Sequence, residues 1–316
     1  VNGSSYAGGF AGKAYSGALA DSGKGISILP GIKGLSINIG DLLSLINAYV
    51  PIVEYAGVKS DKDTLSTNTT IKDPGFTVSA TTMKDLDNNS GSAGGFIGYG
   101  SGVQVSYCDV SNLKNTNVTA PDDLETNDNT ESSVYFDEAQ STYAVTGARY
   151  AGGYIGYMNI GSVASVGSGI SVLGSALGLS DVLSALNVVV STIEHSNVTG
   201  SPGGYAVRAS WKNSASNATL DQVSGDAGGF AGKISGGHIQ DCNSYNFSYI
   251  IGQITAGGYV GSMKPGNVAN VLENTSILGN VIKVDNALAS LLEDFVPTIR
   301  NSSTTCIPCG GAVRAD

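Results

Sequence analysis

The cysteines are the side chains of this chain with the clearest capacity for chemistry. Cys306 and Cys309 form a CxxC pair, whereas Cys108 and Cys242 occur in two similar strand-like segments. A zinc site would need a second such pair, and a redox site would need a thioredoxin-like strand–helix–strand context. Neither is present, so we expect a local disulfide or two unpaired thiols at Cys306 and Cys309. Cys108 and Cys242 are expected to be small buried residues.

Histidine is scarce, which limits acid–base catalysis. The two histidines, His195 and His238, fall in expected strands, and neither belongs to a recognisable catalytic motif. A Ser-His-Asp arrangement depends on geometry rather than on sequence order, so counting residues does not exclude it. The sequence contains no nucleophile elbow, phosphate-binding loop or zinc-peptidase motif. It therefore predicts no catalytic residues and no enzyme.

Carboxylates are densest in one stretch, from Pro121 to Glu138. The main alternative to a binding protein is an enzyme that cleaves polysaccharides on a β-helix. Such an enzyme would need carboxylates clustered on one face of the molecule. This stretch is also rich in Asn, Thr and Ser, so it is expected to be a solvated loop. Because loops on a rigid scaffold often bind partners, Asp122, Asp123, Glu125 and Tyr135 are candidate partner-binding residues.

Two smaller features are further candidates for binding. Trp211 and the nearby Arg208 belong to residue types that dominate interface energies, although Trp211 would suit a core equally well. Asp85, Asp87 and Asn89 place oxygens at alternate positions, as a calcium loop does. The next glycine comes one position later than in an EF-hand, and no glutamate occurs at the required spacing. The match to a calcium loop is incomplete, and no cofactor is predicted.

Composition narrows the class of protein. The 316 residues include 44 glycines, 41% are hydrophobic, only 13% are charged, and the formal net charge is −10. The apolar content is sufficient for folding, and the low charge favours an extracellular protein with a surface of Ser, Thr, Asn and Gly. Sixteen scattered Lys and Arg residues make no basic face for nucleic acid. The uncharged stretch from Tyr150 to Ser180 holds too many Gly and Ser residues to span a membrane.

One hexamer, Ala-Gly-Gly-aromatic-aliphatic-Gly, occurs five times and predicts a repeat architecture. Its glycines permit unusual torsions and close approach of neighbouring chains. Each aromatic residue is expected to point inward and to stack on its equivalent in the next coil, because a single coil cannot bury its own apolar face. The structural residues of the hexamers are Gly8, Gly9, Phe10, Gly94, Gly95, Phe96, Gly152, Gly153, Tyr154, Gly228, Gly229, Phe230, Gly257, Gly258 and Tyr259.

The spacing of the hexamers suggests how many coils the chain forms. A looser relative of the motif begins at Pro202 and recurs at 309–313. The intervals from Pro202 to Ala227 and from Ala227 to Ala256 each suit one coil. The longer intervals are expected to hold further coils as well as excursions.

The hexamers are of two kinds, which differ in the segment that comes directly after them. Two short copies lead straight into a strand with Cys108 or Cys242. Three long copies insert an apolar segment with helical spacing that opens with Asp41, Asp181 or Asp285. An aspartate can cap a helix N-terminus, so a short helix is predicted at each. Each predicted helix leads into a matching strand, at 50–54, 190–194 and 296–300.

The predicted fold class is mainly β, a parallel β-helix (β-solenoid) with short inserted α-helices. Because the chain begins and ends in mid-pattern, we expect a continuous, monomeric solenoid fragment of a larger protein. Its compound repeats fall at approximately 1–144, 145–250 and 251–316.

The hexamer, together with its strands of the Val-x-x-Cys-x-Asn type, resembles the glycine-rich GLUG-type repeats. These repeats occur in very large cell-surface proteins of Gram-positive, often gut-dwelling, bacteria, and the resemblance covers about half of the chain. It implies a parallel β-helix, attachment to the cell wall and adhesion, with host glycoproteins or immunoglobulins among the partners. The partner expected for this chain is a host extracellular protein or glycan. The helical insertions depart from the plain repeat. A surface adhesin is therefore the predicted function. A polysaccharide lyase or glycoside hydrolase and a purely structural spacer are the alternatives.

Overall fold

The computed structural model describes residues 1–16, 50–59, 75–80, 89–114, 143–161, 190–201, 204–210, 225–266, 295–307 and 312–315. Nearly all of their regular structure is β-strand, and neighbouring strands are parallel in every sheet. The prediction of a mainly β chain with parallel pairing is therefore confirmed. The helices predicted to begin at Asp41, Asp181 and Asp285 lie outside the described residues.

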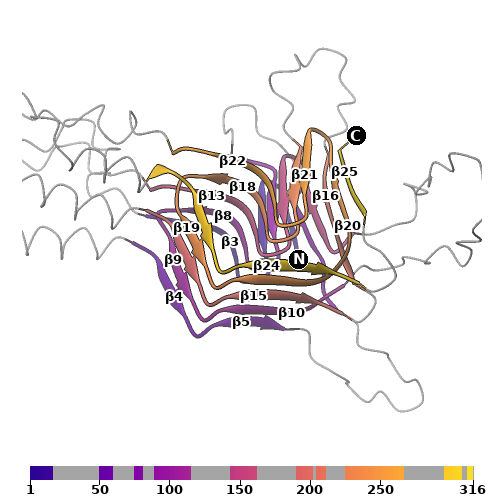
Figure 1. The fold of residues 1–316 in the computed structure, drawn as a ribbon, viewed down its shortest axis with the longest axis horizontal. Coiled ribbons are helices and arrows are strands. Elements are labelled where there is room, and N and C mark those ends of the chain that lie inside the picture. The colour runs from indigo at the N-terminus through magenta and orange to yellow at the C-terminus, as the bar shows by residue number, and fades with distance from the viewer. Residues whose placement is uncertain are drawn as a thin grey trace, which may run out of the picture.

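The chain passes through four sheets in a fixed order and repeats that passage five times. Each passage is called a coil below. It begins with a strand in one half of sheet A, continues through sheets B, C and D, and ends with a strand in the other half of sheet A. The ten-residue strand β20 belongs to both halves, since it pairs with β15 and with β16. Figure 1 shows the equivalent strands β5, β10, β15, the first part of β20 and β24 lying one beside another.

The strands are distributed over the five coils in equivalent sets. Coil 1 contains β1 (Asn2–Gly3), β2 (Tyr6–Gly8), β3 (Ala11–Tyr15), β4 (Ile52–Glu54) and β5 (Gly57–Lys59). Coil 2 contains β6 (Val78–Ala80), β7 (Ser92–Gly94), β8 (Ile97–Ser101), β9 (Gln104–Ser106) and β10 (Asp109–Leu113). Coil 3 contains β11 (Val145–Gly147), β12 (Tyr150–Gly152), β13 (Ile155–Asn159), β14 (Thr192–Glu194) and β15 (Asn197–Gly200). Coil 4 contains β16 (Tyr205–Ala209), β17 (Asp226–Gly228), β18 (Ala231–Ser235), β19 (His238–Gln240) and the first part of β20 (Asn243–Gly252). Coil 5 contains the rest of β20, then β21 (Thr255–Gly257), β22 (Val260–Lys264), β23 (Thr298–Arg300) and β24 (Ser303–Cys306), and β25 (Ala312–Ala315) comes after it.

All five hexamers lie at the bend between sheets B and C, one in each coil. Their first alanines pair in an unbroken series of Ala7, Ala93, Ala151, Ala227 and Ala256. The expectation that the longer intervals hold further coils is therefore wrong, because consecutive hexamers are direct neighbours. The looser motif is not equivalent to the hexamer either, since its two copies contribute to β16 and β25 of sheet A.

Glycine is required at this bend because neighbouring backbones almost touch. A Cβ on Gly156 would lie 2.5 Å from the carbonyl oxygen of Gly98 and 2.6 Å from that of Ala93, both in the adjacent coil. A Cβ on Gly152 would lie 2.0 Å from the carbonyl oxygen of Ile155 in its own coil. No hexamer glycine has a positive φ. Close approach, rather than the unusual torsions suggested by the sequence, is therefore the reason for these glycines.

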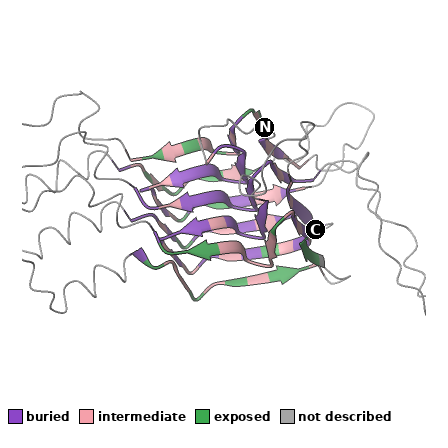
Figure 2. Cartoon of the chain, turned by 90° about the horizontal axis from the view of Figure 1, so that it is seen from above, coloured by how far each residue is buried: buried purple, intermediate pink, exposed green. Residues whose placement is uncertain are grey.

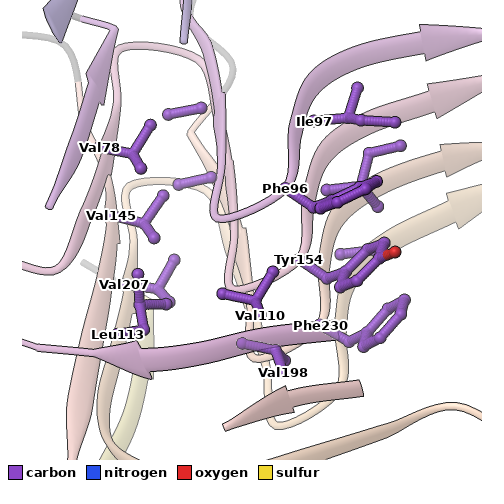
Figure 3. Packing of buried hydrophobic residues seen from close by; sticks show 14 of the residues in the cluster. Val78, Phe96, Ile97, Val110, Leu113, Val145, Tyr154, Val198, Val207 and Phe230 are labelled. Atoms are coloured by element: carbon purple, nitrogen blue, oxygen red, sulfur yellow. The ribbon is translucent and has the colours of Figure 1, made fainter. Parts of the chain in front are cut away.

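The aromatic residues of the hexamers form the centre of the core. Phe96, Tyr154 and Phe230 are fully buried and stack with ring centroids 5.1 and 4.7 Å apart, as Figure 3 shows. Phe10 and Tyr259 extend the stack into the first and last coils. The predicted inward stacking is confirmed. The outermost strands are more exposed than the middle ones (Figure 2), and Phe10 is accordingly 49% exposed.

The coils differ at the corner between sheets C and D. Coil 2 crosses this corner through Gly102 (φ 61°), and coil 4 crosses it through Gly236 and Gly237 (φ 73° and 96°). In coils 1, 3 and 5, residues 17–49, 162–189 and 267–294 come between the same two sheets. The long and short copies of the sequence thus alternate along the stack.

Candidate binding surface at an aromatic corner

A single residue turns each coil from sheet D into sheet A. It has a left-handed backbone, with φ between 48° and 54°, in all five coils. The left-handed region suits Asn, Asp and, to a lesser degree, His, but costs roughly 1–2 kcal/mol for other bulky side chains. Sequence and backbone therefore conflict at the tyrosines of the first two coils. The five residues, in coil order, are Tyr55, Tyr107, His195, Asp241 and Asn301.

The residue after the corner points inward and hydrogen-bonds to the neighbouring coil. The Ala56 N–H donates to Cys108 Sγ (3.4 Å), the Cys108 N–H donates to Ser196 Oγ (3.0 Å), and the Cys242 N–H donates to Ser302 Oγ (3.1 Å). Both cysteines are buried and unpaired, as predicted. They lie two coils apart, with Ser196 in the coil between them. Burial raises the pKa of the Cys242 thiol to about 12, and it also raises the pKa of Cys108.

The corner side chains themselves form an exposed stack. The rings of Tyr55 and Tyr107 are nearly parallel, with centroids 5.1 Å apart, and Tyr107 stacks in turn on the His195 ring at 4.8 Å. His195 Nδ1 lies 3.6 Å from Asp241 Oδ2, which continues the column into coil 4. Tyr55 is 78% exposed and Tyr107 is 50% exposed. We call these four residues the aromatic corner.

A ladder of side-chain hydrogen bonds joins the first residues of the neighbouring sheet A strands β10, β15, β20 and β24. Asp109 Oδ1 accepts hydrogen bonds from the backbone N–H and from Nδ2 of Asn197 (2.8 and 3.1 Å). Asn197 Oδ1 accepts the same pair of bonds from Asn243, and Asn243 Oδ1 accepts from the backbone N–H and the hydroxyl of Ser303. The aromatic corner is therefore supported by buried thiols and hydroxyls beneath it and by this ladder beside it.

Such an arrangement is suited to binding. Large aromatic side chains that are exposed on a monomer often mark an interaction site. Stacked Tyr and His rings on a hydrogen-bonded backbone lose little conformational entropy when a partner contacts them.

The chain matches no protein-family model, no curated protein and no solved structure. The properties of the aromatic corner itself must therefore carry the functional assignment.

The other predicted partner-binding residues are described only in part. Arg208, in β16, lies with its guanidinium carbon 5.2 Å from the ring centroid of Tyr143 and donates from Nε to Ser210 Oγ (2.8 Å). Trp211 and the loop candidates Asp122, Asp123, Glu125 and Tyr135 lie outside the described residues.

The structure bears in part on the predictions about metals, thiols and membranes. Asp85 and Asp87 of the calcium candidate lie outside the described residues, so the structure places only Asn89. In the described part of the chain, no three His, Cys, Asp or Glu side chains gather as metal ligands. Cys306 is an exposed free thiol, and Cys309 is not among the described residues. Within the same part of the chain, no helix is long and apolar enough for a membrane span.

The prediction that both histidines lie inside strands is wrong for His195, which comes directly after β14 at the corner. His238 does begin strand β19, where its Nδ1 lies 2.6 Å from Thr298 Oγ1. Tyr55 and Tyr107 were not predicted from the sequence as surface residues. The signal was present, because the matching strands at 50–54, 190–194 and 296–300 end one residue before the corner. Extending each by one residue aligns Tyr55, His195 and Asn301.

Proposed function

We propose that this chain is a β-solenoid module of an extracellular bacterial surface protein, and that it binds a host macromolecule through the aromatic corner. The observation that carries the proposal is the exposed stack of Tyr55, Tyr107 and His195 on left-handed backbone. Strained backbone of this kind is concentrated at functional sites, where it is retained despite its cost in stability.

The corner is better suited to adhesion than to catalysis. Its three ring residues are exposed at the turn from sheet D into sheet A, whereas catalytic groups work in enclosed sites with shifted pKa values. The sequence also lacks catalytic motifs. The exposed tyrosines and the asparagine ladder beside them resemble the contact residues of antibodies, which bind macromolecules with adaptable polar groups and rigid aromatic anchors.

Binding measurements on the full chain test the proposal. The chain would be immobilised and exposed to purified immunoglobulin, mucin and serum glycoproteins, and the variant Tyr55→Ser/Tyr107→Ser would be compared with the unaltered chain. We expect the double variant to lose at least about tenfold in affinity, as interface aromatic residues do. The control is Tyr15→Ser, which makes the same chemical change at a residue 59% exposed in β3 and should leave affinity unchanged. Equal losses in both variants, or no binding to any partner, would contradict the proposal.

Two further variants separate the corner from the contacts suggested by sequence alone. One chain lacks residues 121–138 and another carries Trp211→Ala. Binding that is lost in either of these chains but retained in Tyr55→Ser/Tyr107→Ser would assign the contact to those segments. Release of reducing ends from a polysaccharide panel would favour a carbohydrate-cleaving enzyme instead.

A further inference from the structure

The acidic side chains of the described coils are segregated at the aromatic corner. The described residues include nine Lys or Arg but only five Asp or Glu, so these coils are basic on balance although the whole chain carries −10. The fifth carboxylate, Asp226, is buried at the start of β17 in sheet B, where it accepts hydrogen bonds from Thr255 and Ser262. The other four carboxylates lie at the corner or directly beside it: Glu54, Asp109, Glu194 and Asp241.

The four carboxylates occupy three of the four successive columns from the end of sheet D to the start of sheet A, and they are spread over coils 1 to 4. Glu54 and Glu194 end the D strands just before Tyr55 and His195, Asp241 is itself a corner residue, and Asp109 begins the next A strand after Tyr107. In these columns, the described residues of coils 1 to 4 include no Lys or Arg. Arg300 in coil 5 is the first cation. The corner therefore combines exposed rings with one acidic group per coil.

The stacking of the rings limits what the corner can recognise. One face of Tyr107 is covered by Tyr55 and the other by His195. A sugar ring or a nucleobase stacks on an open aromatic face. Tyr107 has none, and Tyr55, at the end of the stack and 78% exposed, still offers one. What the stack presents outward is ring edges, tyrosine hydroxyls and the flanking carboxylates, a surface dominated by hydrogen-bond acceptors.

We infer that the aromatic corner binds a cationic segment of its partner, rich in Arg or Lys, and this inference rests on the proposed function. Guanidinium and ammonium groups supply only donors, so they match a surface of carboxylates and hydroxyls. Their aliphatic stems pack along the ring edges.

The experiment measures binding of labelled peptides to the full chain. The probes are a peptide of alternating Arg and Ser and two peptides of the same length with Glu or Gln in place of Arg. We expect the Arg peptide to bind at low salt, to weaken by about tenfold toward roughly 0.15 M salt, and to outbind both other peptides. An Arg peptide that binds no better than the Gln peptide would overturn the inference.

Matched variants locate the site. Glu54→Gln/Glu194→Gln removes two charges from the corner without changing side-chain size, and it should weaken the Arg peptide by about tenfold or more. The control is Ile254→Lys/Met263→Lys, which shifts the net charge by the same amount at exposed positions in other parts of the coils and should weaken binding much less. Equal effects of the two variants would show only general attraction to an acidic chain, and would overturn the inference.

The same variants distinguish failure of this inference from failure of the proposed function. If Tyr55→Ser/Tyr107→Ser abolishes binding of the host protein while Glu54→Gln/Glu194→Gln does not, the corner is the binding surface but the partner segment is not cationic. If free glycans compete with the host protein and the Arg peptide does not, the partner group is a glycan. If neither variant affects binding, both proposals fail.

Discussion

Tyr55 and Tyr107 lie face to face with their ring planes 5° apart, and their φ angles are 52° and 54°. Asn301 occupies the same corner in coil 5 with φ 49° and shows that a residue suited to this backbone is compatible with the fold. The aromatic residues therefore do not follow from the geometry of the turn. Local choices that contradict the backbone without a structural need are expected at functional sites.

Replacing Tyr55 by Asn separates stability from binding. The change relieves left-handed strain of roughly 1–2 kcal/mol and removes one exposed stacking contact of about 0.5–1.5 kcal/mol. We expect the free energy of unfolding, measured with urea, to change by less than about 1 kcal/mol while affinity for the host partner falls. A large loss of stability would show that the stack exists to hold the fold together.

The core stack can be tested by replacing phenylalanine with alanine at a buried position and at a half-exposed one. Phe96→Ala should cost about 3–5 kcal/mol, because it leaves a cavity between two stacked rings. Phe10→Ala makes the same change in coil 1, where half of the side chain is exposed, and should cost less than about 2 kcal/mol. Equal costs, measured by urea unfolding, would contradict the stacking of the coils.

The backbone spacing at the bend between sheets B and C predicts that alanine substitutions at two hexamer glycines have opposite effects on stability. Gly156→Ala places a methyl group 2.5 Å from the carbonyl oxygen of Gly98 and should cost about 3 kcal/mol or more, because backbone must move. Gly258→Ala meets only Thr304 Cγ2, at 3.5 Å, and should be neutral or stabilising by up to about 1 kcal/mol. A Gly156→Ala chain as stable as the unaltered chain would rule out the close approach of neighbouring coils.

The sequence sufficed for the core but not for the number of coils. Five copies of one hexamer with a recurring aromatic position indicate stacking, because each copy must bury its ring against an equivalent. The intervals between copies carry no such information. An interval of one coil plus an excursion has the same length as an interval of several coils, so Ala7 and Ala93 could be recognised as neighbours only from their pairing.

The sequence aligns part of the aromatic corner without marking it as a surface. The matching strands at 50–54 and 190–194 place Tyr55 and His195 in equivalent positions, but nothing in the sequence shows that these positions and Tyr107 share a left-handed backbone torsion. Loop candidates such as Asp122 are prominent instead because acidic runs are visible in a sequence. The four corner carboxylates are scattered through it, and only the coiling of the chain brings them together.

The buried cysteines predict how thiols react in the folded chain. In the variant Cys306→Ser/Cys309→Ser, the remaining thiols are the buried Cys108 and Cys242. Thiolates are the reactive form, and burial raises the pKa of both thiols. We expect no reaction with Ellman's reagent at about pH 8 under native conditions and two equivalents in denaturant. Rapid native reaction would contradict the inward position of this column.

The raised pKa of Cys242 also predicts the pH dependence of stability. An unfolded thiol ionises near its ordinary pKa of 9.0, whereas the folded one stays protonated until about pH 12. Its contribution to folding is therefore complete below about pH 9 and is lost progressively as pH rises from about 9 toward 12. Buried tyrosines such as Tyr205, whose pKa is also raised by burial, add to the same decline. Serine fits this column, because Ser302 occupies the equivalent position in coil 5. Urea unfolding across this pH range should therefore show a shallower loss of stability for Cys242→Ser than for the unaltered chain. Parallel curves for the two chains would contradict the predicted role of the thiol.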